Sequence, residues 1–164
     1  MTEKSTYFYF AYGSNMDKQD LDAWSQDKGL PEITFGDASP ARLAGYRLCF
    51  NYFSTGRGAG AANIMKSDGD SVYGLLVKIG DSELEIIRKK EGHPRYYYEI
   101  CVDIETLDGT VVKDVKTYKV VKDREKPDHQ PPTRYYLQLI IKNARKHGFP
   151  SNYLAFLESI RTKD

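Results

Sequence analysis

The sequence predicts a single α+β domain, spanning residues 1–164, with strands dominating the first three quarters of the chain. Three observations support this. The length of 164 residues suits one domain with a substantial core. Most apolar residues before the last quarter lie in short, alternating or strand-length blocks. No repeat, low-complexity tract or internal linker divides the chain.

The charge balance gives no reason to expect a nucleic acid or a membrane as a partner. Lys and Arg number 24 against 23 Asp and Glu, a net charge of +1. The thirteen tyrosines could stack on single-stranded bases, but that mode also needs clustered basic residues, and the charges here are evenly spread. Residues 1–5 lead straight to a strand without an apolar signal region, and no stretch approaches about 18 apolar residues. We therefore expect a cytoplasmic protein.

The cysteines and histidines predict neither a metal site nor a thiol nucleophile. Cys49 and Cys101 lie far apart in apolar, strand-like runs, so we expect buried, reduced thiols. His93, His129 and His147 are widely separated and have no recognisable partner, whereas zinc needs three or four close ligands.

A strand, a polar loop and a helix follow one another near the start of the chain. Residues 7–11 are aromatic and contain no Gly, Pro or charge, which is typical of a strand. Gly13 permits a sharp turn or a close approach, and Ser14 and Asn15 can cap a helix over 17–24. Such a junction leaves backbone N–H groups free to face an anion or an oxyanion. An ordinary capped turn without a ligand is the simpler interpretation of this pattern taken alone.

The middle of the chain predicts further strands around one Gly-rich segment. We expect extended segments at 33–38, 42–53, 63–65 and 72–79, the last two forming a hairpin around a turn at 67–70. Segment 54–62 lacks the third Gly of a dinucleotide motif and the Lys-Ser/Thr of a P-loop. It is better explained as a mobile loop, or as a place where the backbone closely approaches a ligand.

The next segment predicts a helix that carries an aligned carboxylate. Asp81 is a good N-cap, and 92–94 contains a Gly and a Pro that end the helix. Leu84, Ile87 and Glu91 lie at i, i+3 and i+7, on one face. Partial burial and the negative helix end would both raise the pKa of Glu91 and make it a better base. In the alternative, the helix frays and Glu91 points to water.

The last third of the chain predicts a hairpin, a loop and two helices. We expect strands at 95–106 and 110–121, joined by a turn at 108–109, and then a proline-rich surface loop at 122–132. A helix over 133–144, closed by Gly148, should follow. The final helix is expected over 153–161, capped by Ser151.

Four motifs in this order resemble the γ-glutamylcyclotransferase family, which includes γ-glutamylamine cyclotransferases and AIG2-like proteins. They are YFAYGSNM at 9–16, VYGLL at 72–76, EGHP at 91–94 and PTRYY at 132–136. Thr133 stands where the family often has Ser, and it keeps the capping hydroxyl.

The resemblance implies a small, mixed β-barrel surrounded by helices, and an intramolecular aminolysis. A γ-glutamyl amide would cyclise to 5-oxoproline and release an amine or amino acid, without a cofactor or metal and in a monomer or homodimer. By resemblance Glu91 is the base. The implied substrate-binding residues are Tyr12, Gly13, Ser14, Asn15, Met16, Tyr97 and Tyr136. Tyr97 is the middle one of three tyrosines, so Tyr96 and Tyr98 stay as alternatives.

A second hypothesis belongs to a different class. The chain could be a non-catalytic ligand-binding or interaction module on the same fold. A missing base would favour that hypothesis, whereas Glu91 is present. Substrate specificity is expected to lie in segments 54–62 and 122–132.

Overall fold

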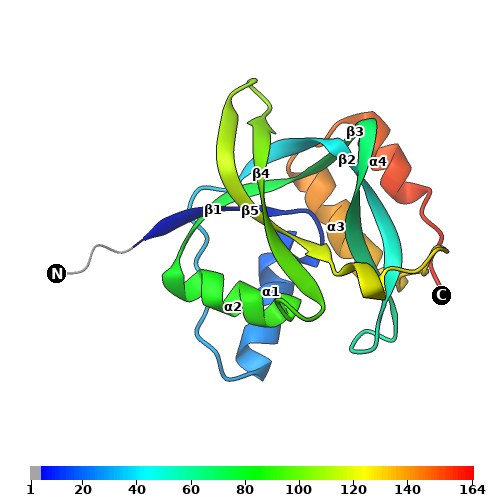
Figure 1. Ribbon diagram of the computed structural model, residues 1–164, viewed down its shortest axis with the longest axis horizontal. Helices are drawn as coiled ribbons and strands as arrows, with labels where there is room; N and C mark the ends of the chain where they lie inside the picture. Colours follow the sequence, from blue (N-terminus) through cyan, green and yellow to red (C-terminus); the bar gives the residue numbers. More distant parts are fainter. Residues whose placement is uncertain (1–4) are drawn as a thin grey trace.

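The protein is described by a computed structural model that covers residues 5–164 and forms one α+β domain around a closed, five-stranded barrel (Figure 1). The strands are β1 (Thr6–Ala11), β2 (Ser39–Ser54), β3 (Ala59–Gly80), β4 (Tyr97–Thr106) and β5 (Val111–Val120). Their order around the barrel is β1-β3-β2-β4-β5. Neighbouring strands are antiparallel except for the parallel pair β1 and β5, so the predicted mixed barrel is confirmed.

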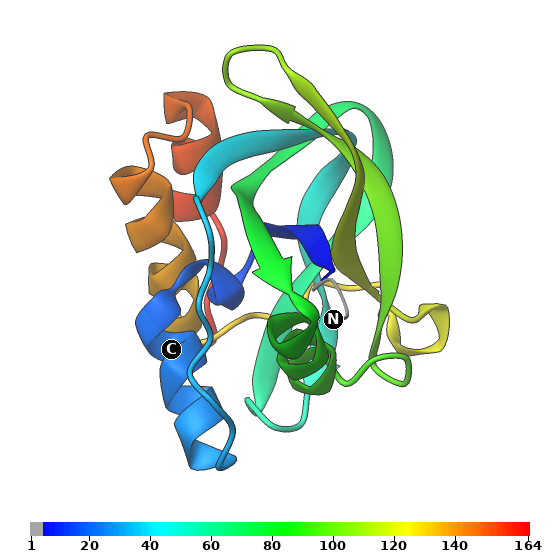
Figure 2. The same cartoon turned by 90° about the vertical axis from the view of Figure 1, so that its left-hand side faces the viewer.

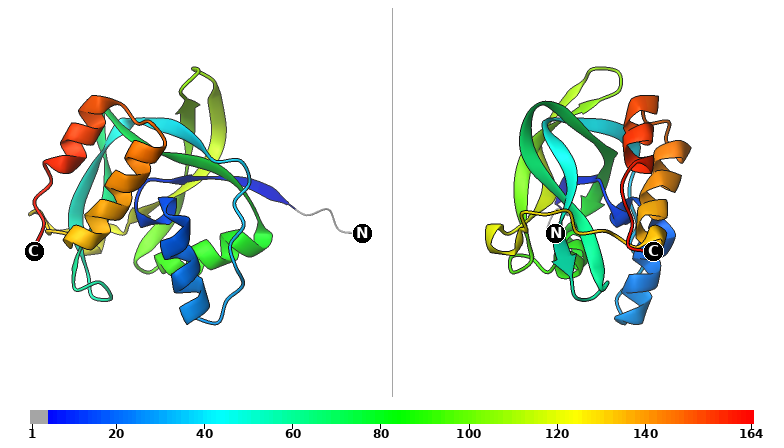
Figure 3. Two further views of the ribbon diagram at one scale, coloured as in Figure 1. Left: turned by 180° about the vertical axis from the view of Figure 1, so that it is seen from behind. Right: turned by 90° about the vertical axis from the view of Figure 1, so that its right-hand side faces the viewer.

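The helices cover one side and one end of this barrel. They are α1 (Lys18–Asp27), α2 (Asp81–Glu91), α3 (Arg134–Lys146) and α4 (Ser151–Glu158), with 3-10 turns η1 (Ser14–Met16) and η2 (Lys122–Arg124). Figures 2 and 3 show α1, α3 and α4 on one side of the barrel. Helix α2 lies at the end where the β2–β3 hairpin turns (Figure 1). No helix in the described part of the chain is long and apolar enough to cross a membrane.

Helix α3 joins the barrel through its apolar face. Leu137, Ile140, Ile141 and Ala144 are all buried in the main hydrophobic cluster. The N-terminus is capped as predicted, because the Thr133 side chain accepts a hydrogen bond from the third residue of the helix.

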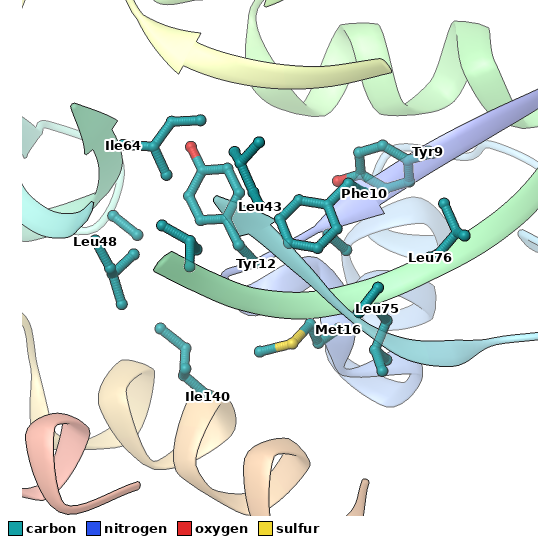
Figure 4. Packing of buried hydrophobic residues seen from close by; sticks show 14 of the residues in the cluster. Tyr9, Phe10, Tyr12, Met16, Leu43, Leu48, Ile64, Leu75, Leu76 and Ile140 are labelled. Atoms are coloured by element: carbon teal, nitrogen blue, oxygen red, sulfur yellow. The ribbon is translucent and has the colours of Figure 1, made fainter. Parts of the chain in front are cut away.

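The barrel core explains one of the glycines in the resembling motifs. Figure 4 shows part of this cluster, with Phe10 beside β3. A Cβ on Gly74 would lie 2.4 Å from the Ala11 carbonyl oxygen and 2.8 Å from the Phe10 ring. Only glycine lets β1 and β3 approach this closely.

The hairpin turn lies at a different place from the one predicted. Strand β3 is continuous through 67–70, and the chain reverses at residues 55–58. Ala44 pairs with Ser71 and Tyr46 pairs with Lys66, so residues 67–70 bulge out of the ladder instead of reversing it. The turn-forming residues there bend the backbone locally, but pairing with β2 continues on both sides.

Three predicted helix caps are wrong. The cap of α1 is Asp17, whose side chain accepts from the Asp20 N–H, and not Ser14 or Asn15, which form η1. Asp81 is the first residue of α2 after the N-cap Gly80, and Ser151 follows the N-cap Pro150.

Three further segments also differ from expectation. Residues 33–38 form no strand, although the Gly36 N–H donates to the Lys78 carbonyl at 2.8 Å. In segment 54–62 the backbone closely approaches another part of the chain and not a ligand. A Cβ on Gly60 would lie 1.7 Å from the Gln130 carbonyl oxygen. The β4–β5 connection has four residues, 107–110, instead of two.

The prediction of two buried thiols is wrong. Both cysteines are free, but Cys49 is only partly buried and Cys101 is exposed on β4. An apolar run in a strand does not by itself tell which face meets solvent, because successive side chains point to opposite faces.

One carboxylate ties α2 to the β4–β5 hairpin. Glu99 accepts two hydrogen bonds of 2.9 Å from Arg88, one of 3.1 Å from Lys116 and one of 2.7 Å from the Tyr118 hydroxyl. Burial alone would raise the pKa of Glu99, but these donors outweigh it and lower the pKa to about 2.

We expect Glu99→Gln to lower the free energy of unfolding at pH 7 by about 2–3 kcal/mol. The ionised carboxylate stabilises the fold above the unfolded-state pKa of about 4.3, and this contribution disappears as the pH falls towards 2. Urea melts at pH 7, 4 and 2.5 test this. The exposed Glu85→Gln on α2 is the control, and a parent–variant difference independent of pH would contradict the prediction.

Candidate functional site

A pocket of about 290 Å³ opens at the barrel end where α2 finishes and the β2–β3 hairpin turns. Its lining includes Tyr9, Tyr12, Gly13, Ser14, Asn15, Tyr52, Arg57, Ala62, Lys90, Glu91, Tyr96, Tyr97, Tyr118 and Tyr136. Residues from all five strands, α2, α3 and η1 therefore meet at one place.

The structure brings seven of the eight predicted site residues into this lining. These are Tyr12, Gly13, Ser14, Asn15, Glu91, Tyr97 and Tyr136. Met16 stays apart: its side chain is 5% exposed and lies in the core with Leu75 and Ile140 (Figure 4). Its N–H donates to the Gly13 carbonyl at 3.1 Å, so it has no free backbone donor for a ligand.

The loop after β1 keeps several backbone donors unpaired. Within residues 5–164, no protein group accepts a hydrogen bond from the N–H of Gly13, Ser14 or Asn15. Gly13 has a φ of −120°, so its backbone does not require glycine. A Cβ there would lie 3.3 Å from the Tyr136 hydroxyl, a tight contact that the tyrosine would have to relieve by moving a few tenths of an ångström. These N–H groups border the pocket and suit an anion or an oxyanion.

Glu91 ends α2 and turns its carboxylate into the pocket. Gly92 follows in the left-handed conformation, with a φ of +66°, and stops the helix. The Asn15 amide nitrogen donates to Glu91 Oε1 at 2.8 Å, and no group of residues 5–164 bonds to Oε2. Burial raises the pKa of Glu91, partly offset by Lys90, Arg57 and the Asn15 hydrogen bond. The helix therefore does not fray here, and the side chain does not point to bulk solvent.

Lys90 is a site residue that sequence reasoning missed. Its side chain is only 8% exposed, and its ammonium group lies 3.7 Å from Asp20 Oδ2. The ammonium also donates to Asn15 Oδ1, and to Ser14 Oγ at 3.4 Å. The sequence did contain a clue: Lys90 lies four residues after Ile86, which is buried, so the two side chains share one face of the helix.

Arg57 is the second missed residue. It is exposed on the β2–β3 turn, and its guanidinium lies 4.3 Å from the centre of the Tyr136 ring. It donates to Ser14 Oγ at 3.1 Å. Arg57 is the only charged residue in the Gly-rich segment 54–62, and this isolated charge could have marked it as a candidate ligand-binding residue.

Two tyrosines hold the backbone N–H and C=O of one β3 residue, Ala62. The Tyr97 hydroxyl donates to the Ala62 carbonyl at 2.6 Å, and the Ala62 N–H donates to the Tyr136 hydroxyl at 3.2 Å. The register shift between Cys49 and Tyr52 of β2 leaves Ala62 without a ladder partner. No group of residues 5–164 accepts the Tyr136 proton, which is therefore available for a ligand, whereas the Tyr97 proton is already engaged.

The three consecutive tyrosines occupy different places. Tyr97 is the one whose hydroxyl lies inside the pocket. Tyr96 lines the rim, with the Arg124 guanidinium 4.3 Å from its ring centre, and Tyr98 is exposed.

The chemistry available is that of a single carboxylate among protonated phenols and nearby cations. Glu91 is the one carboxylate among the described lining residues. Burial raises the pKa values of Tyr97 and Tyr136, so both stay protonated at neutral pH. Residues 5–164 contain no group of three or more His, Cys, Asp or Glu side chains placed to hold a metal ion.

Several known proteins are similar to this chain in sequence and in fold. The model of the AIG2-like family matches residues 71–157. The bovine γ-glutamylcyclotransferase is 30% identical over 97% of this chain and 81% of its own length, and the human one is 27% identical over 99% and 82%. A solved structure titled γ-glutamyl cyclotransferase superposes with a TM-score of 0.81 at 27% identity, covering 98% of this chain and 90% of its own. The chain therefore belongs to the γ-glutamylcyclotransferase and AIG2-like family.

Proposed function

We propose that this protein cyclises a small-molecule γ-glutamyl amide to 5-oxoproline and releases the free amine or amino acid. The observation that carries the proposal is the Glu91 carboxylate, which keeps Oε2 free in a pocket bordered by unpaired backbone N–H groups. The name γ-glutamylcyclotransferase of the relatives supports the same reaction.

The proposed reaction uses a nucleophile that the substrate already contains. The α-amino nitrogen attacks the γ-carbonyl carbon and forms the ring C–N bond, while the bond to the leaving nitrogen breaks. On the way from the α-ammonium group to the lactam, the attacking nitrogen loses two protons. Glu91 accepts them in turn and passes them to the leaving nitrogen, which departs as an ammonium group, so the base is regenerated. No water is consumed, and holding the chain folded back supplies much of the effective molarity.

The remaining pocket residues receive binding roles in this proposal. The N–H groups of Gly13, Ser14 and Asn15 hold the substrate carboxylate or the developing oxyanion. Tyr136 donates its free proton to the substrate, and Tyr97 acts as a wall and an acceptor. Met16 supports the loop from the core. A reaction without a cofactor, a cytoplasmic location and a monomeric or dimeric state remain predictions from the sequence.

Glu91→Gln should lower the turnover number by about 10²–10⁴, because the amide keeps the size of the side chain but not its basicity. Release of 5-oxoproline from γ-glutamyl compounds measures this, and circular dichroism checks that the fold is kept. In the parent, kcat/KM should rise with pH through a pKa above the usual Glu value, as burial requires. Near-parent turnover in the variant would remove Glu91 from the mechanism.

Gly13→Ala should raise KM and lower kcat together, by about three- to tenfold, because the new methyl group lies 3.3 Å from the Tyr136 hydroxyl and must displace this pocket group by a few tenths of an ångström. Ser14→Ala leaves the loop backbone unchanged and is the matched comparison, with a smaller expected effect. Steady-state kinetics on both variants decide. Equal kinetics for Gly13→Ala and the parent would mean that the loop is an ordinary turn.

Blocking the substrate's own amine should abolish the reaction. An N-acetylated γ-glutamyl amide should be inert because its nitrogen is no longer nucleophilic. An α-linked glutamyl dipeptide should also be inert because its amine cannot reach the scissile carbonyl through a five-membered ring. The parent reaction in ¹⁸O-labelled water should give unlabelled 5-oxoproline by mass spectrometry. Label in a glutamate product would instead identify a hydrolase and exclude the cyclisation.

A further inference from the structure

We propose that Lys90 is a positioning residue that fixes the Asn15 side-chain amide and thereby orients the Glu91 carboxylate for proton transfer. This inference rests on the proposed function, since it concerns the same base. It assigns a role to a buried cation that the reaction scheme above leaves unused.

The geometry places the Asn15 amide between two consecutive residues of α2. Its oxygen accepts from the Lys90 ammonium, and its nitrogen donates to Glu91 Oε1 at 2.8 Å and to the Tyr9 hydroxyl at 2.9 Å. All of its polar atoms thus have partners.

The charges of the two neighbours allow only one orientation of this amide. An ammonium group can only donate and a carboxylate can only accept. A flipped amide would set its nitrogen against Lys90 and its oxygen against Glu91, and both contacts would be repulsive. Lys90 therefore decides that the nitrogen faces Glu91, which occupies Oε1 and leaves Oε2 for the substrate.

The burial of Lys90 indicates that its charge has a use. Desolvating an ammonium group is unfavourable, and an apolar residue beside the buried Ile86 and Ile87 would avoid that penalty. The ammonium instead meets three oxygens, one each on Asp20, Ser14 and Asn15. Two of these oxygens, on Ser14 and Asn15, belong to the loop after β1 that borders the pocket.

Lys90 is also one of the two cations that act on Glu91. The other is Arg57, on the β2–β3 turn. The remaining ionisable groups that face Glu91 from the strands and α3 are tyrosines, namely Tyr9, Tyr12, Tyr52, Tyr97, Tyr118 and Tyr136. Asp20, on α1, faces Lys90. Removal of Lys90 should therefore raise the pKa of Glu91, because burial is then opposed by Arg57 and Asn15 alone.

The test compares Lys90→Met with the parent by kinetics and by ¹³C NMR titration of the Glu91 carboxyl. We expect kcat to fall about 10- to 100-fold with KM within about threefold, because a misplaced base slows chemistry more than binding. The Glu91 titration should shift to higher pH. Lys90→Arg keeps a charged donor and should keep most of the activity. The control Lys113→Met removes the same charge from an exposed position on β5 that is not among the lining residues of the pocket. It should change kcat by less than about twofold.

A double-mutant cycle shows whether Lys90 acts through Asn15. In an Asn15→Ala background, Lys90→Met should have less than about a twofold further effect on kcat. An equal effect in both backgrounds, or an unchanged Glu91 titration, would overturn the proposal. If the NMR chemical shifts show that Lys90→Met does not fold, Lys90→Gln replaces it, because a neutral donor can still hold Asn15 Oδ1. In that variant kcat should fall less than about tenfold, while the pKa of Glu91 should still rise. A parent that releases no 5-oxoproline refutes the proposed function, whereas the titration still tests Lys90.

Discussion

The hydrogen bond from Asn15 to Glu91 is the contact on which the pocket depends. It joins residues 76 positions apart in the sequence, and both ends of α2 show why they meet. Thr6 pairs with Gly80, so α2 begins beside the start of β1, and Asp81 accepts a hydrogen bond from the Tyr7 hydroxyl at 2.9 Å. An 11-residue helix is about 16 Å long and a six-residue strand about 20 Å. The helix therefore finishes near the loop that follows β1.

Burial and charge act together on the group at this junction. Burial favours the neutral form of Glu91, whereas Lys90 and Arg57 favour the ionised form. The outcome is a carboxylate with a raised pKa that still has cations close to it. Because the surrounding phenols remain protonated, no other lining acid competes for the proton.

Local signals were sufficient where the chain itself sets the structure. The aromatic run of β1, the Thr133 cap and the left-handed Gly92 were all readable from neighbouring residues, and the four motifs identified the family. The helical face that holds Glu91 followed from its spacing to Leu84 and Ile87.

Tertiary contacts decide the features that the sequence did not reveal. The segment 67–70 has turn chemistry, but the flanking residues of β3 keep pairing with β2 and turn it into a bulge. Lys90 looks like a solvated helix end until Asp20 and Asn15 are brought to it by α1 and η1. Met16 belongs to the resembling motif, yet its apolar side chain takes it to the core.

The division of the pocket between two kinds of structure has an evolutionary consequence. Glu91, Lys90 and Asn15 belong to elements packed into the hydrophobic clusters, whereas Arg57 lies on an exposed four-residue turn between two long strands. Such turns accept insertions and substitutions far more readily than packed elements do. Under the proposed function, exchange of the hairpin tip can therefore change substrate preference while Glu91, Lys90 and Asn15 stay in place.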